Sequence, residues 1–212
     1  FNVIRDMYKK TRCRVKTKEG LTPFIHDIMG VNQGGVLSPL LFRKYISDLD
    51  EYLHRHCGVV LEDSKMLMHL LWADDLVLVS NSVSGMNGLL KSLFEFCSKN
   101  YMIVNEAKTK MMIFGTENGE SFEFNGKQIE IVKQYKYLGN IISPTSRAVG
   151  DLFKNNYLYL KTQGQRAMYA TMHKTSHFGK LPHKLALHLF DTLVKPIVLY
   201  GADVWGTKVA MN

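Results

Sequence analysis

The sequence predicts an α+β protein in which short strands and hairpins come first and helices follow. Alternating apolar segments, separated by glycine- and asparagine-rich turns, dominate the chain up to Pro144. After residue 148 the pattern is mostly helical. Strands and helices grouped in this way, without a regular βαβ alternation, are typical of the α+β class. We therefore expect two parts, residues 1–145 and residues 146–212.

Composition limits the function classes. The chain has 212 residues, of which 46% are hydrophobic and 22% charged, which is ordinary for a globular protein. No apolar stretch reaches the roughly 18 residues of a transmembrane helix, so we expect no membrane partner. The three cysteines are widely spaced and indicate neither a disulfide framework nor a zinc site, which favours an intracellular protein. Because the chain begins with Phe1, we expect a fragment.

The net charge of +8 is typical of proteins that meet polyanions, and it is unevenly placed. Residues 3–11 read as the end of a helix, 12–18 as a strand with one basic side, and 22–30 as a second short strand. Phosphates are the commonest target of such a basic run, although a solvated face would also explain it. Seven cations oppose only Asp6 here: Arg5, Lys9, Lys10, Arg12, Arg14, Lys16 and Lys18.

A glycine-rich loop, "GVNQGGVL", precedes Ser38-Pro39. Serine at the N-cap and proline at the first helical position predict a helix start there. Apolar residues at helical spacing extend this helix to residue 53, namely Leu41, Tyr45, Ile46, Leu49, Tyr52 and Leu53.

Residues 66–80 predict two strands that meet at Asp74-Asp75. Asp-Asp is not a favoured hairpin turn, so another requirement is expected to select it. Adjacent carboxylates suit Mg²⁺, which binds one or two carboxylates together with waters and substrate phosphates. Two-metal phosphoryl transfer needs a further acid from another strand. A plain acidic turn is the alternative for the pair taken alone.

The rest of the first part predicts one helix and several strands. Residues 86–99 read as an amphipathic helix with Leu89, Leu90, Leu93, Phe94 and Cys97 inward. Strands are expected at 101–104, 110–115 and 134–143, with a hairpin over 122–132 around the Asn125-Gly126 turn. In the basic second part, Pro182 and Pro196 should stop or kink helices.

Four segments in this order closely resemble the later blocks of reverse transcriptases from non-LTR (LINE-type) retrotransposons. They are "GVNQGGVLSPLLF", "LLWADDLVLVS", "VNEAKTKMMIFG" and "YKYLG". The stretch "LFDTLVKPIVLYGADVWG" resembles the region that follows the polymerase in those elements. The resemblance covers nearly the whole chain. It implies a right-hand polymerase palm followed by a helical thumb, with the fingers and the first palm strand missing.

The resemblance also implies residue roles around the aspartate pair. Asp74 would coordinate the catalytic Mg²⁺ ions, with Mn²⁺ as the alternative, and Asp75 would support the site more weakly. Trp72 stands where the family usually has Tyr or Phe and would keep an aromatic platform near the primer end. Gln33 and Gly34 match the block that contacts the templating base pair and the incoming nucleotide. Asn32 replaces a residue that is usually basic.

Further roles follow from the later blocks. Lys108 would sit near the leaving pyrophosphate, where a lysine can offset charge or donate a proton. Tyr137, Leu138 and Gly139 match the strand that grips the primer backbone, and the basic helices after 148 would lie along the duplex. The implied partners are an RNA template, a DNA primer and deoxynucleoside triphosphates, in the nucleus. No obligate protein partner is predicted.

The family's remaining catalytic acid is not found upstream. Asp6 lies in a helix-like segment, and Asp27 is too close to Gly30 to be that residue, so neither is assigned. We therefore expect no polymerase activity from this chain by itself. The alternative is a decayed or co-opted module that binds nucleic acid without chemistry. A phosphohydrolase or kinase-like fold is less well supported, because no Walker-type loop, Ser/His/Asp set or HExxH motif is present.

Overall fold

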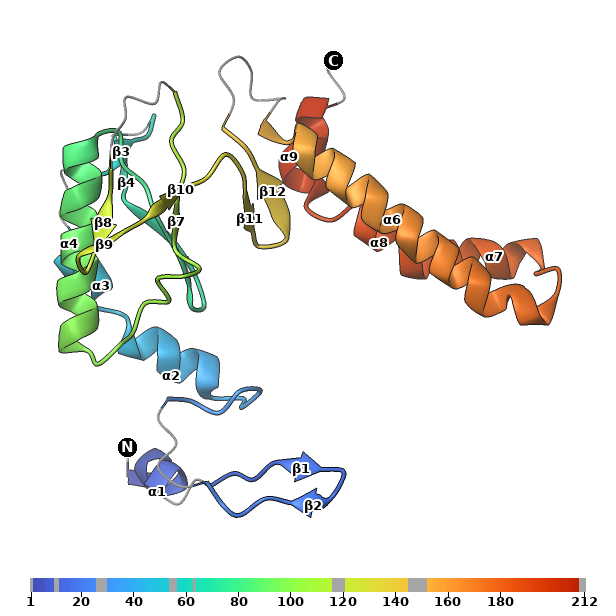
Figure 1. Cartoon of the computed structure of the whole chain (residues 1–212), viewed down its shortest axis with the longest axis horizontal. Helices are drawn as coiled ribbons and strands as arrows, with labels where there is room; N and C mark the ends of the chain where they lie inside the picture. The colour runs from blue at the N-terminus through green and yellow to red at the C-terminus, as the bar shows by residue number, and fades with distance from the viewer. Residues whose placement is uncertain are drawn as a thin grey trace. The chain divides into compact units, whose positions relative to one another are not determined.

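The computed structural model divides the chain into two compact units, Phe1–Phe96 and Cys97–Asn212. Figure 1 labels the elements of both units along the chain. The predicted boundary near residue 145 and the unassigned Asp27 fall outside the described residues. The structure describes residues 2–9, 12–25, 30–53, 57–62, 64–115, 121–144 and 152–209, with side chains up to residue 206.

The first unit mixes short helices with hairpins, as the sequence predicts. Its strands form two-stranded antiparallel sheets, in which β1 pairs with β2, β3 with β4, and β5 with β6. The helices are α1 (Asn2–Lys9), α2 (Ser38–Tyr45), α3 (Leu49–Tyr52) and α4 (Val83–Lys99). The strands are β1 (Lys16–Thr17), β2 (Gly20–Leu21), β3 (Val59–Val60), β4 (Met66–Leu67), β5 (His69–Trp72) and β6 (Asp75–Leu78).

Helix α4 supplies the core of this unit. Leu89 and Phe96 are almost fully buried, and the Phe96 ring meets Tyr52 of α3 edge-on, with ring centroids 5.2 Å apart. The predicted inward face is confirmed except at Phe94, which is 38% exposed. A helix turns about 100° per residue. Phe96 therefore lies about 20° from the direction of Leu89, whereas Phe94 lies about 140° away.

The helix predicted from Ser38 to residue 53 is interrupted. It forms as α2 and α3, separated by a turn at residues 46–48. Pro39 occupies the first turn of α2, as predicted, but the N-cap is Leu37 rather than Ser38. The Ser38 hydroxyl instead donates to the Asn32 carbonyl at 2.5 Å. The capping side chain is thus used to hold the preceding loop.

The second unit begins with short strands and ends with helices. β7 and β10 pair in parallel, while β8–β9 and β11–β12 are antiparallel hairpins. The strands are β7 (Lys110–Met111), β8 (Glu123–Phe124), β9 (Lys127–Gln128), β10 (Glu130–Ile131), β11 (Tyr135–Tyr137) and β12 (Asn140–Ile142). The helices are α6 (Lys154–Thr175), a 3₁₀ turn (Ser176–Phe178), α7 (His183–Leu189), a π-helical turn (Phe190–Val194), α8 (Lys195–Val198) and α9 (Ala202–Val209).

Two strand predictions for this unit need correction. Residues 101–104 form no strand. Residues 134–143 form a hairpin rather than one strand, because Leu138 and Gly139 adopt positive φ angles of +44° and +85° and reverse the chain. The hairpin predicted at Asn125-Gly126 is confirmed, with φ angles of +52° and +72°. Paired positive φ angles are typical of tight hairpin turns.

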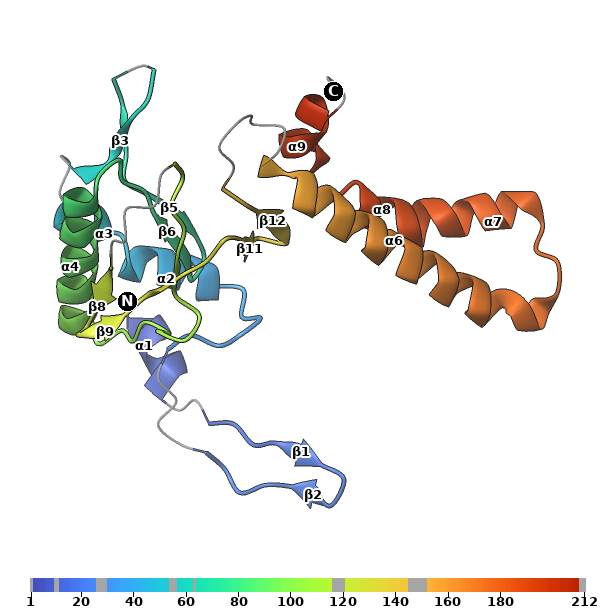
Figure 2. The same cartoon turned by 45° about the horizontal axis from the view of Figure 1, so that its top comes forward.

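The helical region packs on itself and on β12. Helix α6 runs alongside the segment that contains α7 and α8, as Figures 1 and 2 show from two directions. The close approach is made at Gly164, where an added Cβ would collide with Val198 of α8. Pro182 precedes the first residue of α7, and Pro196 lies in the first turn of α8, so both prolines mark helix starts. In the described part of the chain no helix could span a membrane.

Candidate functional site

The β5–β6 hairpin, labelled in Figure 2, carries the aspartate pair. Its turn differs from the prediction by one residue. Trp72 pairs with Asp75, so the two turn residues are Ala73 and Asp74 rather than the two aspartates. Ala73 adopts a φ of +53°, in the left-handed region. That conformation costs a non-glycine residue roughly 1–2 kcal/mol. Asp74 therefore lies in the turn itself, and Asp75 begins β6.

The carboxylates of Asp74 and Asp75 are both exposed and available to bind a ligand. Among the described residues, neither Asp74 nor Asp75 forms a hydrogen bond or an ion pair through its side chain. No cluster of three or more His, Cys, Asp or Glu suited to a metal occurs in the described ranges. The pair can therefore offer two carboxylate groups to a hard cation. This fits Mg²⁺, which takes few protein carboxylates and fills its shell with water and substrate oxygens.

The hairpin that holds the pair has an apolar surface. Trp72 is 67% exposed, and Leu70 and Leu71 are also exposed. The β5–β6 sheet has two strands in the described part of the chain. Leu70 and Trp72 lie on one face of the hairpin and Leu71 on the other, so apolar side chains are exposed on both faces beside the two carboxylates. Trp72 lies opposite Asp75 across the two strands.

The glycine-rich loop lies in the same unit and is held by its backbone. The Asn32 carbonyl accepts hydrogen bonds from the Gly35 amide at 3.0 Å and from the Ser38 hydroxyl at 2.5 Å. Gly34 has a φ of +79°, which suits the third position of a tight turn. Gln33 and Gly34 are both exposed. The fold therefore presents these two residues on the surface of a turn whose ends are fixed.

Lys108 belongs to the second unit and lies in a turn stabilised by Asn105. The Asn105 carbonyl accepts hydrogen bonds from the backbone amides of Lys108 and Thr109, at 3.1 and 3.0 Å. The Lys108 side chain is exposed and forms no ion pair with another described residue. Two other lysines close by in the sequence are paired: Lys110 with Glu130 at 2.6 Å and Lys127 with Glu106 at 2.5 Å. The Lys127 ammonium lowers the pKa of Glu106 below its ordinary value.

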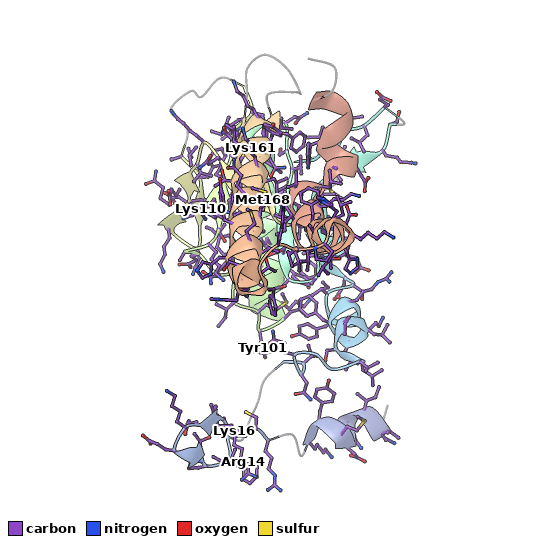
Figure 3. All side chains as sticks on the ribbon, turned by 90° about the vertical axis from the view of Figure 1, so that its right-hand side faces the viewer. Arg14, Lys16, Tyr101, Lys110, Lys161 and Met168 are labelled. Carbon is purple, nitrogen blue, oxygen red and sulfur yellow. The ribbon has the colours of Figure 1, made fainter. Side chains whose placement is uncertain are left out.

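The β1–β2 hairpin presents arginines and an aromatic ring together. The guanidinium carbons of Arg12 and Arg14 lie 4.3 and 4.8 Å from the centre of the Phe24 ring. Residues 12–25 are exposed apart from Thr22. Figure 3 labels Arg14 and Lys16 on this hairpin. Cations gathered around one ring form a compact positive surface with a stacking face, a combination that suits nucleic acid.

Comparison with known proteins decides the family. The family described as reverse transcriptase (RNA-dependent DNA polymerase) matches residues 2–142, which is more than half of the chain. The chain belongs to the reverse transcriptase family. The match includes the basic hairpin, the glycine-rich loop, the aspartate hairpin, the Lys108 turn and the residues predicted to grip the primer. The helices from residue 152 onward lie beyond it.

Relatives of this reverse transcriptase chain come from mobile elements. It is 24% identical over 156 residues to a transposon-derived protein of Caenorhabditis elegans, covering 71% of this chain and 53% of that protein. It is 25% identical over 189 residues to the "RNA-directed DNA polymerase from mobile element jockey" of Drosophila melanogaster, covering 84% and 19%. It is 25% identical over 224 aligned positions to the Drosophila melanogaster "Probable RNA-directed DNA polymerase from transposon BS", covering 100% and 24%. The chain thus spans about half or less of the length of these relatives.

Two contributors to this reverse transcriptase chain were missed by sequence reasoning. Asn156 is fully buried; its side chain accepts a hydrogen bond from the Ile141 amide at 2.8 Å and donates to the Asn140 side chain at 3.1 Å. Tyr200 donates its hydroxyl proton to the Leu138 carbonyl at 2.9 Å. Both residues reach back to the β11–β12 hairpin from far along the chain. An asparagine in an otherwise apolar helical stripe was the available signal for Asn156.

Proposed function

We propose that this chain is the part of an RNA-directed DNA polymerase that provides two of its metal-binding carboxylates, Asp74 and Asp75. The supporting observation is the placement of two uncommitted carboxylates at and beside a hairpin turn, within the region matched by the reverse transcriptase family. Mg²⁺, or Mn²⁺ in its place, would supply charge stabilisation at the reacting phosphate when bound there.

The protein's own contribution at this hairpin is placement. The β5–β6 strands fix the turn, and its positive φ at Ala73 sets the direction in which Asp74 leaves the backbone. Asp75, paired with Trp72, keeps an aromatic face beside the acids. In the proposed enzyme the primer end would lie against Trp72. Asp74 and Asp75 would hold the cation, which would supply positive charge for the nucleotide phosphates.

Two exposed turns would contact the nucleotide and its leaving group: the Gln33-Gly34 turn and the turn that contains Lys108. Gly34 has no side chain to keep a flat base away, and Gln33 beside it can hydrogen-bond to that base. Lys108 has an unpaired ammonium among the described residues, which suits neutralising a leaving pyrophosphate. Lys110 and Lys127 are less suited to neutralising pyrophosphate, because each already forms an ion pair with a glutamate.

The template and primer backbones would contact the basic surfaces. On the β1–β2 hairpin, Arg12, Arg14 and Lys16 can neutralise successive phosphates, while Phe24 offers a face to a base or sugar. The helices after residue 152 would extend this contact along an RNA–DNA duplex, as a thumb. A nuclear site of action rests on the resemblance to retrotransposon enzymes alone.

A second candidate function is nucleic-acid binding without chemistry. It is favoured by one observation: the described residues hold no third acid close enough to complete a metal cluster. Under this alternative the basic hairpin and helices would still bind RNA–DNA duplexes, but the aspartate pair would have no role.

Templated extension by a longer polymerase that includes these 212 residues distinguishes the two functions. Asp74→Asn should abolish incorporation, because the amide cannot replace the anionic ligand. Glu62→Gln is the matched control, since Glu62 is an exposed acid in another turn of the same unit. Full activity of Asp74→Asn would contradict the proposed metal-binding role of Asp74. Nucleic-acid binding without chemistry would then be the remaining proposal for this chain.

A further inference from the structure

A tyrosine from the helical region holds the tip of the β11–β12 hairpin. Tyr200 donates its hydroxyl proton to the Leu138 carbonyl at 2.9 Å, although the two residues are 62 positions apart. Leu138 and Gly139 form the two-residue turn between β11 and β12. Both partners belong to the second unit, where β11–β12 lies beside α6 and α9 (Figure 1).

The turn at the tip needs such a partner. Leu138 has a φ of +44°, and a side chain in this left-handed region costs roughly 1–2 kcal/mol. Gly139 has a φ of +85°, and an added Cβ there would lie 2.7 Å from Cε1 of Tyr200. Glycine therefore serves two purposes at this position. It permits the backbone angle, and it lets the tyrosine ring lie directly against the turn.

Tyr200 is itself fixed in place by its surroundings. The buried Trp205 donates its indole N–H to the Tyr200 carbonyl at 2.8 Å. Gly201, with a φ of +70°, lies so close to the Asn140 side chain that an added Cβ would come within 2.8 Å of it. Asn140 is in turn bonded to the buried Asn156. The hairpin is thus held at its turn by Tyr200 and, immediately after the turn, at Asn140 and Ile141 by Asn156.

We propose that Tyr200 is a positioning residue that fixes the Leu138-Gly139 turn against the primer end. This inference rests on the proposed function and on the family resemblance, which implies that Tyr137, Leu138 and Gly139 grip the primer backbone. Tyr200 touches the turn and no reacting group, so it acts through Leu138 and Gly139. Small misplacements of a reacting end are costly in polymerase-type chemistry, because reactivity depends steeply on the approach of the attacking atom.

Amide hydrogen exchange tests the contact itself. Tyr200→Phe removes only the hydroxyl, so exchange at Gly139 and Asn140 should accelerate by about two- to tenfold, the range for one lost hydrogen bond. Tyr169→Phe is the matched control, because Tyr169 is an exposed tyrosine on α6. Unchanged exchange at the turn in Tyr200→Phe would overturn the proposal.

A glycine pair tests the ring contact. Gly139→Ala and Gly126→Ala both place a Cβ at a hairpin-turn glycine of positive φ, at +85° and +72°. Only position 139 brings that Cβ against Tyr200, since position 126 has no neighbour within 4 Å. Gly139→Ala should therefore raise exchange more than Gly126→Ala does at its own turn, and Tyr200→Ala should remove the difference. Equal effects at both turns would contradict the contact.

A fluorescent base at the primer terminus tests whether Tyr200 positions the turn against the primer end. The full chain is bound to an RNA–DNA duplex that carries 2-aminopurine at the primer 3′ end. Tyr200→Phe should change the 2-aminopurine signal while duplex affinity stays within about twofold. Faster turn exchange without a change at the primer end would overturn the primer role of Tyr200. That result would leave the Asp74 assignment untouched, because metal binding at Asp74 is measured independently.

Discussion

Trp72 and Asp75 face each other as the last paired residues of the β5–β6 hairpin, so the turn consists of Ala73 and Asp74. This pairing gives the two neighbouring aspartates different positions in the hairpin. One lies in the turn and the other begins a strand beside an aromatic ring. The arrangement depends on an alanine at φ +53°, where glycine would be expected from backbone energetics alone.

Replacing Ala73 tests the strain at this turn. Ala73→Gly should stabilise the chain by up to about 1 kcal/mol, because relief of the left-handed alanine exceeds the greater flexibility of glycine in the unfolded state. Urea denaturation measures the change. Ala107→Gly is the control, since Ala107 lies in a turn with no positive φ and the substitution there should destabilise slightly. A loss of stability in Ala73→Gly would show that the turn is unstrained.

The basic hairpin should contribute to nucleic-acid affinity through phosphate contacts. Arg12→Gln with Arg14→Gln should weaken binding to an RNA–DNA duplex and reduce the slope of log affinity against log salt by about 1.5, since each phosphate contact adds about 0.7–0.9. Fluorescence anisotropy over a salt series measures this. Lys91→Gln with Lys133→Gln removes the same charge from exposed sites outside the hairpin. The same slope change in both double variants would mean that only net charge matters.

Asn156 should be the most sensitive polar residue of the second unit. Asn156→Ala leaves the Ile141 amide and the Asn140 side chain without their partner, so the expected cost is about 2–3 kcal/mol. Asn155→Ala is the neighbouring control. Asn155 is exposed and makes one described hydrogen bond, to Ser143, so its loss should cost less than about 1 kcal/mol. Denaturant unfolding compares them, and similar costs would contradict the role of Asn156.

The isolated chain should bind a primed RNA template without extending the primer. Two carboxylates without a third described acid should hold the cation weakly and orient it poorly. A gel-based extension assay with deoxynucleoside triphosphates measures this. Robust templated extension by the 212 residues would show that the metal site is complete within the chain.

Local sequence signals predicted several elements correctly. The Asn125-Gly126 turn, the strands on either side of the aspartates and the inward face of α4 all follow from short-range patterns. The turn at Ala73-Asp74 could not be predicted, because alanine rarely adopts the required φ. The Leu138-Gly139 turn could not be predicted either, because leucine also rarely adopts a positive φ.

Long-range contacts also escaped prediction. Tyr200 and Asn156 reach β11–β12 from distant parts of the chain, and no local pattern records such a pairing. The roles assigned to Gln33, Gly34, Lys108 and residues 137–139 came from family resemblance. They remain predictions about residues that the fold leaves exposed or partly exposed.

Paramagnetic Mn²⁺ tests the central assignment most directly. In the ¹⁵N-labelled chain, titrated Mn²⁺ should broaden the amide signals of residues 73–76 first, and Asp74→Asn with Asp75→Asn should abolish that selective broadening. Glu62→Gln should leave it unchanged. Broadening that survives the double variant, or that spreads equally over other exposed acids such as Glu62, would contradict a metal site at the hairpin.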